Sequence, residues 1–156
     1  MKKALLLAAS HAAVLLFGFG LGIYLLPILT APQGPSSANV QAIAQAAPYT
    51  GTLRRDLRGS DLLHWGEGTV SVGQQNITLV GKLSPGPDYK LYLVPEFVED
   101  EAQFLKLKSQ SLRVGEIKTF KNFVVPVPAG VDLMRYNTVL VWCETFSEFI
   151  SAARYR

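Results

Sequence analysis

The segment from Ala4 to Thr30 contains 27 residues and carries no charged side chain. Leu, Ala, Val, Phe, Ile and Gly make up most of it. About 20 residues, each rising 1.5 Å, are enough to cross the hydrocarbon core of a bilayer in a helix. The segment is therefore long enough to form one transmembrane helix, and the rest of the chain must fold as a separate unit.

A cleaved signal peptide is the main alternative for this segment. Its apolar region would span about 7 to 15 residues, with a small-x-small cleavage site close behind. The best such site, Ala44-Gln45-Ala46, lies far beyond the apolar segment, so we expect an uncleaved signal anchor. Lys2 and Lys3 precede the span and the next charge is Arg54. The positive-inside rule then predicts a cytoplasmic N-terminus and a periplasmic or extracellular domain.

Residues 31–48 are rich in Ala, Gln, Ser and Pro and contain few large apolar side chains. Such a composition cannot form a core of its own. We interpret the segment as a linker that holds the domain off the membrane, with at most a short helix in residues 40–47. The expected organisation is an anchor at 1–30, this linker, and a β domain at 49–156.

Short apolar runs of period two, separated by Gly, Pro, Asn and Asp, characterise the chain from Tyr49 onward. This pattern is typical of β-strands. The clearest case is a hairpin predicted over residues 69–80, with a turn at 73–76. Its inward side chains should be Val70, Val72, Ile77 and Leu79.

Further strands are predicted at 89–94, 112–117, 122–127, 138–144 and 148–155. The charged stretch 96–108 is predicted to be a long exposed excursion. Seven or eight strands in a domain of this size predict an all-β fold, an antiparallel β-sandwich or a small barrel.

Charge argues against a nucleic-acid partner. The pI of about 9.1 is basic, but from Pro48 onward 13 Lys and Arg residues face 12 Asp and Glu residues. The domain is nearly neutral and has no Lys/Arg-rich run, so it lacks the electrostatic footprint of phosphate-backbone binding. The hydrolase, phosphate-loop and metalloprotease motifs are also absent, so no enzyme class is indicated.

Four motifs follow one another along the domain. They are His64-Trp65-Gly66-Glu67-Gly68-Thr69-Val70, then Gly86-Pro87-Asp88-Tyr89-Lys90-Leu91-Tyr92-Leu93, then Val114-Gly115-Glu116-Ile117-Lys118, and finally Tyr136-Asn137-Thr138-Val139-Leu140-Val141-Trp142-Cys143 with Phe146 and Ala152-Ala153. In this order and spacing, roughly residues 51–156 resemble the DM-thirteen domain family, here in a membrane-anchored form with one such domain. The resemblance implies an extracellular domain, a companion of DOMON domains in animals. It also implies electron transfer through a cysteine, either as a bare thiol or by holding a prosthetic group.

Cys143 is the only cysteine of the chain and lies on the predicted strand 138–144. Alternation places it on one face with Val139 and Val141, while Trp142 points to the other face. Free cysteine is among the residues most often buried. Cys143 is therefore either a core residue of a non-catalytic binding or interaction module, or the redox thiol that the resemblance implies.

A reactive thiol requires a lowered pKa, which a nearby cation, metal or histidine can provide. Arg135 and His64 are the candidates, and His64 is the only histidine of the domain, since His11 lies in the apolar segment. If Cys143 is the redox residue, we predict His64 as its partner and expect the two to approach each other at one end of the sandwich.

The donor set limits the metal centres that the chain can form. One Cys, one His and Met134 do not complete a structural zinc site, and a blue-copper site needs two histidines. The Cys-x-x-Cys-His motif of covalent haem attachment is absent. A noncovalent haem on Cys143 or His64 stays open, and the sequence does not identify the cofactor, the electron donor or the protein partner.

Overall fold

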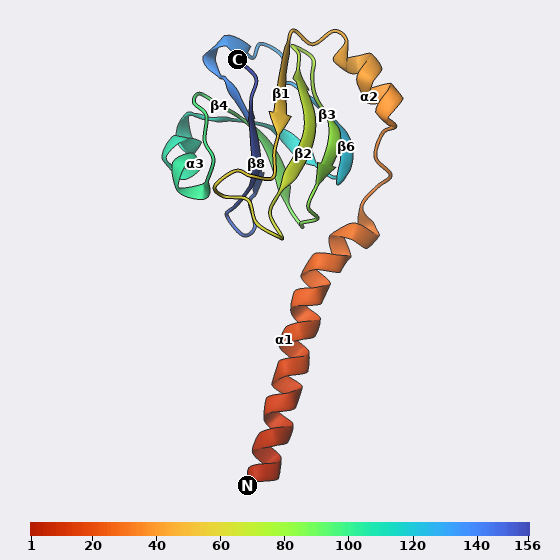
Figure 1. Cartoon of the computed structure of the whole chain (residues 1–156), viewed down its shortest axis with the longest axis vertical. Helices are drawn as coiled ribbons and strands as arrows, with labels where there is room; N and C mark the ends of the chain where they lie inside the picture. The colour runs from red at the N-terminus through yellow and green to blue at the C-terminus, as the bar shows by residue number, and fades with distance from the viewer.

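The computed structural model describes all residues from Met1 to Arg156 and shows a long N-terminal helix below a β-sandwich (Figure 1). The helices are α1 (Lys2–Thr30), α2 (Ser37–Ala44) and α3 (Glu101–Leu107), with short 3-10 turns η1 (Lys108–Gln110) and η2 (Leu133–Arg135). The strands are β1 (Tyr49–Leu53), β2 (Gly66–Val72), β3 (Asn76–Leu83), β4 (Tyr89–Val94), β5 (Leu112–Ile117), β6 (Lys121–Pro126), β7 (Thr138–Cys143) and β8 (Glu148–Arg154).

The strands form two antiparallel sheets, in the orders β1-β2-β3-β6 and β5-β4-β7-β8. The predicted all-β antiparallel sandwich is thus confirmed. In the predicted hairpin, Val70 pairs with Leu79 and Val72 pairs with Ile77, and all four side chains are buried. The strand that was not predicted is β1, which pairs with β2 at the edge of the first sheet.

Both faces of the second sheet are covered, which is why every residue of β7 is buried. A core of 22 residues, including Val139, Val141 and Cys143, fills the space between the sheets. Nine further buried residues, including Leu140 and Trp142, pack on the outer face of the second sheet. The predicted alternation of β7 is confirmed, and Cys143 and Trp142 lie on opposite sides of one sheet.

The region 96–108 covers this outer face, and the prediction of an exposed excursion was wrong. Asp100 caps α3 by accepting a hydrogen bond from the backbone N–H three residues on, at 2.8 Å. Phe104 is fully buried, with its ring centroid 4.8 Å from that of Trp142 and 5.2 Å from that of Tyr92. A helix of two turns is too short to show an amphipathic period among so many charges, so one buried aromatic side chain went unrecognised.

The segment 31–48 contains α2, which packs against β3 and β6 of the first sheet. Val40 of this helix is fully buried. Asn122, in the left-handed conformation with φ 54°, donates hydrogen bonds from Nδ2 to the Pro35 carbonyl at 3.0 Å and to the Ser37 hydroxyl at 3.1 Å. The chain between α1 and β1 is therefore attached to the side of the sandwich.

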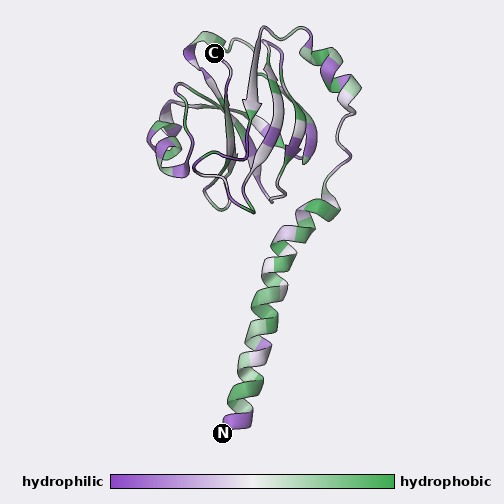
Figure 2. Cartoon of the chain, viewed as in Figure 1, coloured by the Kyte–Doolittle hydropathy of each residue, from purple (hydrophilic) through white to green (hydrophobic).

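Helix α1 is mostly apolar beyond its hydrophilic N-terminal end (Figure 2), and none of its residues is buried. By length and composition it could cross a membrane once, as an anchor or a signal sequence. It extends from the end of the sandwich at which the β1–β2, β3–β4 and β7–β8 connections lie (Figure 1). Any site at this end of the domain therefore lies beside α1.

Candidate functional site

Cys143 and His64 line one pocket of about 280 Å³ at the α1 end of the sandwich. Cys143 is the last residue of β7, and His64 lies in the β1–β2 connection, two residues before β2. Tyr89, the first residue of β4, pairs with Cys143 across the sheet and completes the floor of the pocket. The two residues singled out from the sequence thus line the same pocket, and their pairing as redox thiol and partner stays a prediction.

Asp61 positions His64 in this pocket. One carboxylate oxygen, Oδ1, accepts hydrogen bonds from the backbone N–H groups of Leu63 at 2.7 Å and of His64 at 2.8 Å, an Asx turn. The other, Oδ2, lies 2.9 Å from Nδ1 of His64. When Nδ1 carries the proton and donates it to this carboxylate, Nε2 is left as an acceptor.

The pKa of Asp61 reflects the same contacts. Partial burial works against its ionisation, but the hydrogen bonds from His64 and Leu63 outweigh burial and lower the pKa. An ionised Asp61 favours the His64 tautomer described above. Asp61 was not singled out from the sequence, although an Asp three residues before the domain's only histidine is a signal for such a turn.

Cys143 is buried, with 3% of the residue exposed. Burial is the largest influence and raises its pKa, while the backbone N–H groups of Phe146 and Asp88 act in the opposite direction. Burial also raises the pKa of Tyr89, whose hydroxyl lies 3.4 Å from that of Ser84. The floor of the pocket is consequently neutral at neutral pH, and Cys143 needs a proton acceptor before it can react as a thiolate.

A protein-family model matches the part of the chain that contains this pocket. Residues 59–155 match the family model described as Electron transfer DM13. The chain belongs to the DM13 family. The predicted resemblance is confirmed, and the DM13 match includes β2 to β8 and both pocket residues. No curated protein and no solved structure matches the chain.

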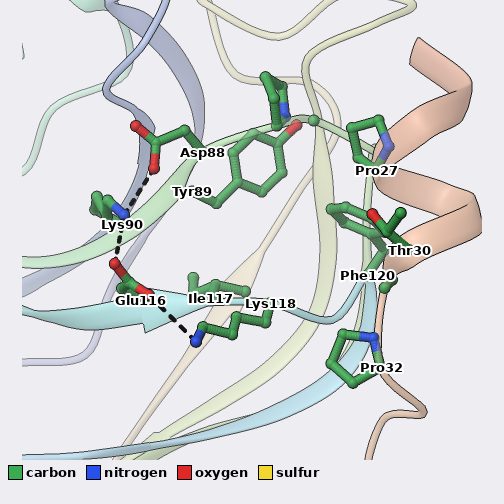
Figure 3. A pocket seen from close by; sticks show the side chains of 13 residues that line it. Pro27, Thr30, Pro32, Asp88, Tyr89, Lys90, Glu116, Ile117, Lys118 and Phe120 are labelled. Atoms are coloured by element: carbon green, nitrogen blue, oxygen red, sulfur yellow. Dashed lines mark hydrogen bonds and ion pairs between the residues drawn. The ribbon is translucent and has the colours of Figure 1, made fainter. Parts of the chain in front are cut away.

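A second pocket of the DM13 domain adjoins the first and has a similar volume of about 280 Å³ (Figure 3). Its wall carries Lys90, whose Nζ lies 2.7 Å from Asp88 and 2.9 Å from Glu116. The hydrogen bond from Lys90 lowers the pKa of Asp88. The Asp88 carbonyl in turn accepts the Glu144 N–H at 3.1 Å. The ion-pair network thus joins the start of β4 to β5, and the backbone hydrogen bond joins it to the end of β7, next to Cys143.

Two other sequence candidates lie away from the pocket. Arg135 and Met134 belong to η2, which precedes the first residue of β7, whereas Cys143 is its last residue. Met134 accepts a hydrogen bond through sulfur from Tyr49 at 3.2 Å. Arg135 does not line the pocket, so its guanidinium is not the cation that could lower the pKa of the Cys143 thiol.

A metal ion and a haem are groups that an electron-transfer domain could hold. No three His, Cys, Asp or Glu side chains lie close enough together to bind a metal ion. The volume of about 280 Å³ is below the ~300–1,000 Å³ that encloses drug-sized ligands, and a porphyrin is at least as large as these. The pocket therefore does not fit an enclosed haem.

Proposed function

We propose that this protein is a membrane-tethered, extracytoplasmic electron-transfer domain with Cys143 as its redox residue and His64 as the proton acceptor. One observation carries the proposal. In a family described by electron transfer, the only cysteine of the chain and the only histidine of the domain line the same pocket.

The proposed organisation follows the segments of the sequence. Residues 1–30 are the anchor, 31–48 the linker and 49–156 the redox domain. Lys2 and Lys3 keep the N-terminus in the cytoplasm, and the domain lies in the periplasm or outside the cell.

The proposed chemistry couples an electron to a proton. A buried neutral thiol that lost only an electron would become a charged radical cation, and burial disfavours the charged form. Its proton must therefore leave with the electron. The Cys143 thiol passes its electron to a one-electron carrier outside the domain and its proton to Nε2 of His64, leaving a thiyl radical and an imidazolium. Reduction of the thiyl radical returns the electron and the proton to Cys143. Asp61 supports the imidazolium by its contact with Nδ1.

A non-catalytic binding module is the second candidate, and the burial of the thiol favours it. Cys143 is 3% exposed and belongs to the core between the sheets, as a purely packing residue would. In that case the pocket serves a ligand or partner, and the sulfur takes no part.

Thiol alkylation across a range of pH separates the two functions. For the redox function, Cys143 reacts with iodoacetamide in the folded protein, and His64→Ala raises the apparent pKa of the thiol because the imidazolium is lost. His11→Ala, which removes the other histidine of the chain, is the matched control and leaves the profile unchanged. If Cys143 stays inert to high pH and His64→Ala has no effect, the redox function fails and the binding module takes its place.

A further inference from the structure

Exposed apolar side chains lie at the Cys143 pocket and next to it. Leu62, Leu63 and Phe146, which we call the apolar rim, are 94%, 57% and 48% exposed. Leu63 and Phe146 line the pocket, and Leu62 is the neighbour of Leu63. In the domain only Leu105 and Met134 are comparably exposed large apolar residues. Gathered apolar exposure of this kind marks an interaction site.

Helix α1 places the apolar rim relative to a bilayer. If the hydrocarbon core begins at Ala4, its ~30 Å thickness takes about 20 residues and ends near Ile23. Tyr24 then lies in the interfacial layer, where tyrosine is enriched. Both Ile23 and Tyr24 line the same pocket as Cys143. In this placement the pocket mouth lies at the level of the lipid–water interface, at the end of the sandwich from which α1 extends (Figure 1).

The interior of the pocket selects a neutral ligand with a hydroxyl group. Its floor is uncharged, because the Cys143 and Tyr89 side chains keep their protons. The carboxylates of Asp61, behind His64, and of Glu148, on the pocket wall, disfavour an anion. When Nδ1 of His64 donates its proton to Asp61, Nε2 is an acceptor and can take one O–H donor.

We propose that the apolar rim inserts into the bilayer surface and that the pocket takes, from the lipid phase, the hydroxylated ring of a lipid-soluble quinol. The volume of about 280 Å³ admits the ring, while its hydrocarbon chain remains in the bilayer. The position of the pocket follows from α1 and the apolar rim, and only the choice of a redox-active ring rests on the proposed function. The proposal concerns binding and assigns no electron step to the quinol.

The first experiment measures insertion of the rim. The full-length protein is placed in phosphatidylcholine vesicles with acyl chains brominated near the interface, which quench tryptophan on contact. Leu62→Trp is the test variant and Phe146→Trp a second reporter. Met134→Trp, at the other end of the sandwich and 56% exposed, is the matched control. We expect the emission added at 62 and 146 to be quenched and that at 134 to persist. Equal emission changes at all three positions would overturn the membrane contact.

The second experiment measures quinol binding in phosphatidylcholine vesicles with unbrominated acyl chains, under anaerobic conditions. The probe is a benzoquinol with a fully substituted ring, which cannot add to thiols, and a ten-carbon chain. Its chainless analogue is the control compound. At about ten times its Kd the chained quinol should slow alkylation of Cys143 about tenfold, and His64→Ala should weaken this protection. The unfolding midpoint, measured with both compounds, provides the same comparison if alkylation is too slow to follow.

The outcomes separate this proposal from the redox function. One outcome is that the quinol slows alkylation of Cys143, while His64→Ala leaves the pH profile of alkylation unchanged when no quinol is present. This outcome supports the lipid-facing site and removes the redox role of Cys143. A thiol that responds to His64→Ala, with neither protection nor a shifted midpoint, overturns the quinol site and leaves the redox role standing.

Discussion

Replacing Phe104 by Ala should unfold much of the outer layer of the domain. The ring is fully buried and contacts the rings of Trp142 and Tyr92. Truncating a buried Phe to Ala costs about 3–5 kcal/mol, and an aromatic pair adds about 0.5–1.5 kcal/mol to simple burial. Against a total stability of about 5–15 kcal/mol for a domain, this loss removes a large fraction of the folding free energy.

Chemical denaturation followed by tryptophan fluorescence measures this loss, because Trp142 reports directly on the contact. Leu105→Ala is the matched control: it truncates the next residue of α3, whose side chain is 47% exposed, and should cost less than about 1 kcal/mol. At roughly 4 °C per kcal/mol for a domain of about 100 residues, the two variants should also differ by about 10 °C in Tm. Equal losses for both would refute the assignment of residues 96–108 to a buried layer.

Two further predictions concern the ion-pair network and the linker. Asp88 has a lowered pKa in the folded state, so its contribution to stability is present above the ordinary pKa of 3.8 and is lost as the pH falls through the folded pKa. Lys90→Met should therefore lower the midpoint of urea unfolding at pH 7. Below pH 4 the difference in midpoint between this variant and the unsubstituted protein should narrow. Asn122→Gly keeps the left-handed backbone but removes the hydrogen bonds to Pro35 and Ser37, so limited proteolysis should cut the segment 31–48 faster while the β-sheet circular dichroism stays unchanged.

The strands that could be predicted are those in which the pattern of apolar side chains matches the pattern of buried positions. In β7, Val139, Val141 and Cys143 alternate with two large apolar residues, and the sandwich buries both sets. In β1 only Leu53 is buried, while Tyr49 and Gly51 are partly covered and the two Thr residues are exposed, so the strand depends on pairing with β2. Cross-strand pairing of this kind leaves little trace in one sequence.

The site could be predicted in part for a related reason. Cys143 and His64 stand out because each is unique in the domain, which is a property of composition. Asp61 acts through geometry: three hydrogen-bond contacts within one turn orient His64. The apolar rim likewise results from two connections, one carrying Leu62 and the other Phe146, that only the finished fold brings to one mouth.

The attachment of the segment 31–48 to the sandwich changes how the domain can search its surroundings. As a free chain, 18 residues would let the domain wander over roughly 23 Å of end-to-end distance and tumble in any direction. With Val40 buried and Asn122 holding Pro35, that freedom is largely removed. With α1 as the proposed anchor, the domain turns about the helix axis and drifts in the plane of the membrane within the short reach of the chain before Pro35. In that proposed arrangement, encounters with lipid-borne molecules are two-dimensional, whereas a carrier from the aqueous phase meets a domain of restricted orientation.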